Sequence, residues 1–148
     1  MVLPQVSGED SLPGDRITLF EGDRSVPSDS SNIVAIVDDD GDVREVLDAL
    51  LESVGHTVKT YRGGQQLLDD PELHDVVCLI VDQKMPKMTG LALLRELNHT
   101  GRTIPSLLIT GLPDAQIASE ARELGAIDVL VKPIEWEKLL KLVAYAVQ

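Results

Sequence analysis

The sequence predicts an α/β fold in which five βα units build a doubly wound parallel sheet. From residue 33 onward, short apolar runs typical of buried strands alternate with segments of helical periodicity. This alternation indicates parallel strands joined by crossover helices. The 148 residues are 43% hydrophobic and only 3% aromatic, so we expect one core built mainly from aliphatic side chains. In such a sheet, sites form beyond the carboxyl ends of the strands.

Each element has its own signal in the sequence. Apolar residues recur at 3.6-residue spacing from Val43 to Val54, and Gly55 can end this first helix in a left-handed conformation. Thr89 can cap the third helix, and Gly125 marks the end of the fourth. The expected elements are strands at 33–37, 57–61, 76–81, 106–109 and 128–131 and helices at 43–54, 64–69, 89–98, 114–124 and 134–147.

Residues 1–32 differ in composition from the rest of the chain. They hold three of the eight prolines, six serines and six acids, against two arginines. A segment of this composition cannot bury enough apolar surface to fold by itself. We therefore expect a disordered acidic leader at 1–32, followed by a single domain at 33–148.

Charge and cysteine content exclude several classes of function. The net charge of −12 argues against direct nucleic-acid binding by this chain, because counterion release needs clustered Lys and Arg. The single cysteine, Cys78, lies inside an apolar run and is expected to be a small buried hydrophobe. No signal peptide opens the sequence and no apolar run approaches the ~20 residues that span a bilayer. We expect a cytoplasmic protein without membrane contact.

Four of the expected strands end in side chains that suit phosphoryl chemistry. Taken alone, each has a structural explanation, as a solvated acidic turn, an Asx turn, a turn hydroxyl or a surface lysine. Together at one edge of a sheet, carboxylates, a hydroxyl and an ammonium indicate phosphoryl chemistry with a hard cation. The residues are, in chain order, Asp38, Asp39, Asp40, Asp82, Thr110 and Lys132.

These residues resemble the receiver domains of two-component response regulators, which are CheY-like, and the closest likeness is to FixJ-type receivers. The likeness covers residues 33–148 and implies a flavodoxin-like sheet of strand order 2-1-3-4-5, with a cis peptide before Pro133. The motifs that carry it, in family order, are Val37-Asp38-Asp39, Asp82-Gln83-Lys84-Met85-Pro86-Lys87-Met88-Thr89-Gly90, Ile109-Thr110-Gly111 and Val131-Lys132-Pro133.

The resemblance implies a role for each acid. Asp82 would accept the phosphoryl group from a histidine kinase or a phosphotransfer protein. Mg²⁺ would be bound by Asp39, Asp82 and the backbone carbonyl of Lys84, with Asp38 holding the ion largely through water. Such an ion would neutralise the acids and the transferred group, and oxygen ligands are those that it prefers. The chain would be a signalling protein and not an enzyme, apart from self-phosphorylation and autodephosphorylation of Asp82.

On the same resemblance, Thr110 would hydrogen-bond the phosphoryl oxygens and Lys132 would pair with them. Many receivers carry Tyr or Phe three residues before the lysine, where this chain has Val129. A valine cannot exchange an aromatic ring between buried and exposed positions, so the loop after Thr110 is the remaining local switch. The switched surface would bind other proteins, including a second copy through the fourth helix, fifth strand and fifth helix.

Two alternatives use the same residues. The Asp38-Asp39-Asp40-Gly41 segment also matches the D-x-D-G opening of haloacid-dehalogenase-type phosphatases, with Asp38 as nucleophile and Asp40 as acid/base. That alternative lacks an acidic pair after Lys132 and leaves Asp82 without a role. A pseudoreceiver that signals by binding alone is the second alternative, and the complete set of acids, threonine and lysine argues against it.

Overall fold

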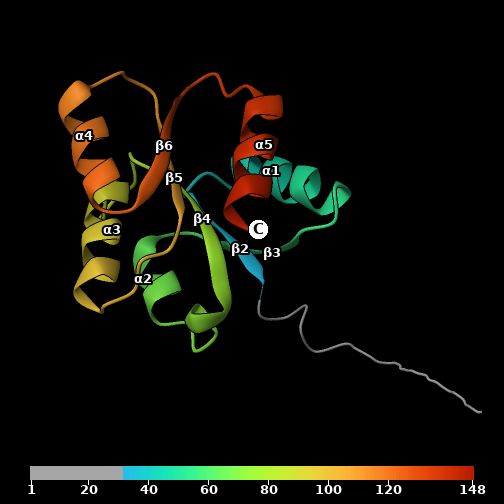
Figure 1. The fold of residues 1–148 in the computed structure, drawn as a ribbon, viewed down its shortest axis with the longest axis horizontal. Coiled ribbons are helices and arrows are strands. Elements are labelled where there is room, and N and C mark those ends of the chain that lie inside the picture. The colour runs from blue at the N-terminus through green and yellow to red at the C-terminus, as the bar shows by residue number, and fades with distance from the viewer. Residues whose placement is uncertain (1–31) are drawn as a thin grey trace, which may run out of the picture. The chain divides into compact units, whose positions relative to one another are not determined.

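The computed structural model describes residues 32–148, so residues 1–31 of the expected leader lie outside the described part (Figure 1). The longest helix has 13 residues, and in the described range none is long and apolar enough to cross a membrane. The elements are β2 (Ile33–Val37), α1 (Gly41–Ser53), β3 (Thr57–Tyr61), α2 (Gly64–Leu68), η2 (Leu73–Asp75), β4 (Val76–Asp82), α3 (Gly90–His99), β5 (Ser106–Thr110), α4 (Ala115–Glu123), β6 (Ala126–Val131) and α5 (Trp136–Ala146).

The five described strands form one parallel sheet in the order β3-β2-β4-β5-β6. Counted along the described chain, this is the expected order 2-1-3-4-5, so the flavodoxin-like topology is confirmed. The central pair is β2 and β4, in which Val37 lies opposite Val81. Because the next residues are Asp38 and Asp82, the two acids leave neighbouring strands side by side at the carboxyl edge.

Helices cover both faces of the sheet, with α1 and α5 on one side and α2, α3 and α4 on the other (Figure 1). Alternate strand residues point to opposite faces, so Val34 and Ile36 of β2 pack under α1 and α5, while Ala35 and Val37 join the other layer. All five residues of β2 are buried. As expected, Cys78 is fully buried, and burial raises the pKa of its thiol to about 12.

Most element boundaries follow the sequence signals. Gly55 has a φ of +95° after α1, as the cap prediction requires. Three predicted starts are wrong. Helix α1 begins at Gly41, two residues early, because Asp40 caps it. Strand β6 begins at Ala126, two residues early, because this residue pairs with Ser106 of β5. Helix α5 begins only at Trp136, two residues late, because Ile134 packs against the apolar layer under the helix and Glu135 is extended. The short η2 was not predicted.

Gly90 allows α3 to approach the backbone of β4 closely. Its N–H donates to the carbonyl oxygen of Gln83 over 3.1 Å, and the Gln83 side chain accepts a hydrogen bond from Leu91 N over 2.9 Å. A Cβ on Gly90 would lie 2.8 Å from the carbonyl oxygen of Asp82 and 2.6 Å from Leu108 Cδ1. Only glycine fits, so the start of α3 is packed directly on the residue that ends β4.

We predict that Gly90→Ala lowers the free energy of unfolding by about 1–3 kcal/mol, because the new methyl group overlaps main-chain atoms that cannot rotate away. Urea unfolding measures the change. Gly111→Ala is the matched control, since a Cβ there would have no heavy atom within 4 Å, and it should not destabilise the protein. Equal stability of the two variants would contradict the close packing of α3.

Candidate metal centre

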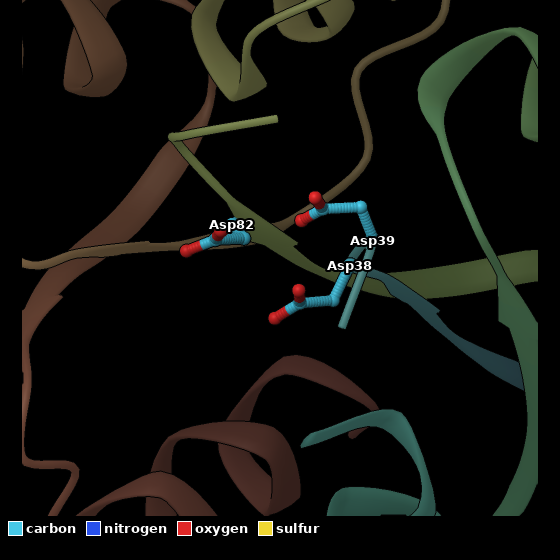
Figure 2. Close-up of side chains that lie close together, drawn as sticks. All are labelled: Asp38, Asp39 and Asp82. Atoms are coloured by element: carbon cyan, nitrogen blue, oxygen red, sulfur yellow. The ribbon is translucent and has the colours of Figure 1, made fainter. Parts of the chain in front are cut away.

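Three carboxylates meet at the carboxyl edge of the sheet. Asp38 and Asp39 follow β2, Asp82 ends β4, and one oxygen from each lies within 4.8 Å of the other two. Figure 2 shows the three side chains pointing to the same side of the strand ends. Asp38 and Asp82 are only 3% and 5% exposed, whereas Asp39 is exposed. The cluster is therefore buried at Asp38 and Asp82 and open to solvent at Asp39.

The surroundings of these acids disfavour their charged forms. Burial is the main cause that raises the pKa of Asp38 to about 6, with a contribution from Asp82 and against the hydrogen bond from Asp40 N. Burial also raises the pKa of Asp82, although Lys132 opposes this shift. A divalent cation would remove the repulsion between the acids, and clustered carboxylate oxygens are the donors that Mg²⁺ prefers. The residues present thus fit the implied Mg²⁺.

Lys132 brings a positive charge to the same edge. Its Nζ lies 3.3 Å from Asp82 Oδ1, and its backbone N–H donates to the carbonyl oxygen of Thr110 over 2.9 Å. The peptide between Lys132 and Pro133 is cis, as the resemblance implied. Because the lysine backbone is held by β5 and its side chain reaches Asp82, the end of β6 is connected to the acidic cluster.

Thr110 lies at the end of β5 and is 7% exposed. Its hydroxyl donates to the carbonyl oxygen of Leu112 over 3.1 Å and accepts from Leu112 N over 3.3 Å. The hydroxyl is thus engaged in its own loop and not with Asp82. Thr110 and Lys84, two residues beyond Asp82, line a cavity of about 560 Å³, a volume within the usual range of small-ligand pockets. The role of the Lys84 carbonyl as an Mg²⁺ ligand stays a prediction.

Sequence reasoning listed Asp40 among the site acids but missed its role as a helix cap, and it missed Arg44 altogether. Asp40 is the N-cap of α1, where its carboxylate accepts hydrogen bonds from Asp42 N over 2.9 Å and Val43 N over 3.4 Å. An acid just before a helical pattern is the usual signal for such a cap. Arg44 donates from a guanidinium nitrogen to the carbonyl oxygen of Asp38 over 2.6 Å. No sequence rule identifies that contact.

Fold and site together define a doubly wound α/β protein with an acidic centre at its switch point, and known proteins resemble the chain in sequence and fold. Residues 34–144 match the response regulator receiver domain. The response regulator protein TodT of Pseudomonas putida is 36% identical over 121 residues, which cover 82% of this chain and 53% of TodT. The transcriptional regulatory protein FixJ of Azorhizobium caulinodans is 41% identical over 102 residues, which cover 69% of this chain and 48% of FixJ.

A solved structure agrees with these relatives. The crystal structure of FixJ-N superposes with a TM-score of 0.69 at 36% identity, covering 78% of this chain and 92% of that structure. The chain spans about half the length of the curated relatives that it matches. The chain belongs to the receiver domain family of two-component response regulators, and the resemblance found in its sequence is confirmed.

We predict that the metal-free protein loses stability as pH rises. The folded pKa of Asp38, about 6, exceeds the ordinary 3.8, so the folded state binds this proton more tightly than the unfolded chain does. The contribution of Asp38 is therefore most favourable below about pH 4 and is lost as pH rises through about 6, by about 2–3 kcal/mol in total. Urea unfolding in EDTA across this range measures it.

Asp38→Asn should remove the part of this pH dependence that comes from Asp38, leaving that of Asp82. The variant should exceed wild type in stability at neutral pH, because the amide oxygen can still accept the bond from Asp40 N. Asp39→Asn is the matched control at the same site. Asp39 is exposed, so a smaller gain is expected. A metal-free Asp38→Asn variant less stable than wild type at neutral pH would show that burial of this carboxylate is not unfavourable.

Proposed function

We propose that this domain is a phosphoacceptor that takes a phosphoryl group from a histidine kinase or a phosphotransfer protein onto Asp82, with Mg²⁺ as cofactor. The observation that carries the proposal is the position of Asp82. It is a buried carboxylate at a strand end, 3.3 Å from Lys132 Nζ and within 4.8 Å of two other carboxylates. Family membership supports the same role.

In the proposed reaction, an oxygen of Asp82 attacks the phosphorus of a phosphohistidine, the P–O bond forms, and the P–N bond breaks with the electron pair leaving on the imidazole. Mg²⁺, held by Asp38, Asp39, Asp82 and the Lys84 carbonyl, would neutralise the acids and the incoming anion. Burial raises the pKa of Asp82, and Lys132 opposes this shift and so favours the ionised carboxylate. Its ammonium is then available to a phosphoryl oxygen on the same carboxylate.

Signalling would begin at Thr110. To donate to a phosphoryl oxygen on Asp82, its hydroxyl must leave the carbonyl oxygen of Leu112. A Cβ on Gly111 would meet nothing within 4 Å, so the loop has room to move there. Val129 is half-buried and packs against the layer that includes α4, and it offers no aromatic rotamer. We infer that movement of the loop from Thr110 to Asp114 carries the signal.

The surface that responds would comprise α4, β6 and α5, and it would serve protein partners, including a second copy of the chain. The relatives TodT and FixJ are named a response regulator and a transcriptional regulator. By that analogy, this chain would control an output such as transcription, without contacting DNA through its own acidic surface. We also propose that the protein is cytoplasmic and that it consists of a leader at 1–32 and a domain at 33–148.

The phosphatase alternative gains no support from the site. It needs the Asp40 carboxylate as an acid/base, but that group caps α1 through two backbone N–H groups. It also leaves Asp82 and its ion pair with Lys132 unexplained. A pseudoreceiver would not need this ion pair either, so phosphoryl acceptance is the function that the geometry supports best.

We predict that the protein incubated with Mg²⁺ and acetyl phosphate gains the mass of one phosphoryl group on Asp82. Asp82→Asn should gain none, because it lacks the nucleophilic carboxylate, and removal of the metal by EDTA should prevent the gain in wild type. Intact-mass spectrometry, followed by mapping of the modified peptide, measures the result. Modification of Asp38 instead would favour the phosphatase alternative and contradict our proposal.

We also predict that Thr110→Ala accepts the phosphoryl group on Asp82 but loses most of the phosphorylation-dependent change over α4, β6 and α5. The substitution removes the hydroxyl that would draw the loop toward the phosphoryl group, while Asp82 and Lys132 stay in place. Amide shifts in NMR before and after phosphorylation measure the response. A response as large as that of wild type would show that the signal does not pass through the Thr110 loop.

A further inference from the structure

Arg44 has no part in the proposed chemistry, yet its side chain contacts the acidic turn. It lies in the second turn of α1 and donates from Nη1 to the carbonyl oxygen of Asp38 over 2.6 Å. Gly41 leaves room for this contact, because a Cβ there would lie 3.3 Å from Arg44 Nη2. Gly41 is not among the described glycines with positive φ. The backbone at this position therefore does not require glycine. The absence of a Cβ on Gly41 instead leaves space for the Arg44 guanidinium.

The hydrogen bond from Arg44 is one of three that hold Asp38 in place. The Asp38 N–H donates to the carbonyl oxygen of Tyr61 over 3.1 Å, and its Oδ1 accepts from Asp40 N over 2.9 Å. The carbonyl held by Arg44 belongs to the peptide that joins Asp38 to Asp39, so its direction sets how Asp39 leaves the strand. The side chain of Asp39 makes no hydrogen bond or ion pair with any residue from 32 to 148. Its position thus depends on this peptide.

Arg44 makes this contact although a carboxylate is nearby. Asp48 follows four residues later in the same helix, a spacing that suits an ion pair with arginine. Both residues line a pocket of about 180 Å³, together with Thr60 of β3. Asp48 Oδ1 is buried there without a hydrogen-bond partner, and the described ion pairs do not join it to Arg44. The guanidinium is thus directed to the Asp38 carbonyl while a buried acceptor in its own pocket stays unsatisfied.

We propose that Arg44 is a positioning residue for the metal centre, which sets the Asp39 carboxylate relative to Asp38 and Asp82 by holding the peptide between the two neighbouring acids. This inference rests on the proposed function, in which these carboxylates bind Mg²⁺. If Arg44 acted through its charge alone, its removal would change the Mg²⁺ affinity in the opposite direction. A cation close to the acids repels Mg²⁺, so its removal would tighten Mg²⁺ binding, whereas loss of the peptide anchor weakens it.

The sign of the change in Mg²⁺ affinity when Arg44 is replaced therefore distinguishes a positioning role from an effect of charge alone. Mg²⁺ is titrated into Arg44→Gln and followed by amide shifts in NMR, with the Tm of the metal-free protein measured in parallel. We expect the Kd for Mg²⁺ to rise about tenfold, as for other residues that orient metal ligands. Arg95→Gln is the matched control, since it makes the same charge change in α3, where Arg95 pairs with Glu120, and its Kd should stay close to that of wild type.

Equal or tighter Mg²⁺ binding by Arg44→Gln would overturn the inference. Failure of the wild-type protein to bind Mg²⁺ would instead contradict the proposed function itself, so the two failures are distinguishable. Gly41→Ala provides a second variant, because its methyl group would lie 3.3 Å from Arg44 Nη2 and shift the guanidinium from its place on the Asp38 carbonyl by a few tenths of an ångström, while alanine favours the helix. Weaker Mg²⁺ binding without a lower Tm supports the inference, and if Arg44→Gln does not fold, unchanged Mg²⁺ binding by Gly41→Ala overturns it.

Discussion

The site depends on the parallel pairing of β2 with β4, in which Val37 lies opposite Val81. Side chains alternate along a strand, so a shift of one residue would turn Asp82 to the other face of the sheet and away from Asp38. The register is fixed by packing on both faces. Ile36 and Ile80 enter the layer under α1 and α5, while Val37 and Val81 enter the opposite layer. Purely hydrophobic contacts thus determine where two carboxylates meet.

Contacts from neighbouring elements then hold the acids close together, although their negative charges repel one another. Lys132 at the end of β6 lowers the pKa of Asp82 against the effect of burial, and Asp40 N donates to the carboxylate of Asp38. Gly90 lets α3 begin against the backbone of Asp82. These contacts come from segments far apart in the sequence. The segments that follow β2, β4 and β6 therefore form one connected structure around the acids and are not independent turns.

The sequence was sufficient to predict a parallel sheet and most boundaries, because buried strands and capped helices leave local signals. The strand order was predicted only through the resemblance to receiver domains. The sequence was also sufficient to predict that Asp38, Asp39 and Asp82 lie close together, since the carboxyl ends of parallel strands lie at one edge of the sheet. The starts of β6 and α5 were wrong because pairing with Ser106 and the packing of Ile134 are tertiary effects. Sequence patterns also do not reveal which acceptor a long or rotatable side chain chooses. The contact of Arg44 with Asp38 and that of Thr110 with Leu112 are of this kind.

The bond between the Thr110 hydroxyl and Leu112 limits how strongly this threonine alone can drive a switch. If Asp82 is phosphorylated, the hydroxyl exchanges a neutral acceptor for a charged one, and the difference between such bonds is about 1 kcal/mol. That difference changes a two-state population by less than about tenfold, whereas moving it from 1:99 to 99:1 needs about 5.5 kcal/mol. With Val129 in place of an aromatic ring, the remainder must come from Lys132 or from a partner. Without such contributions the domain would respond in a graded manner.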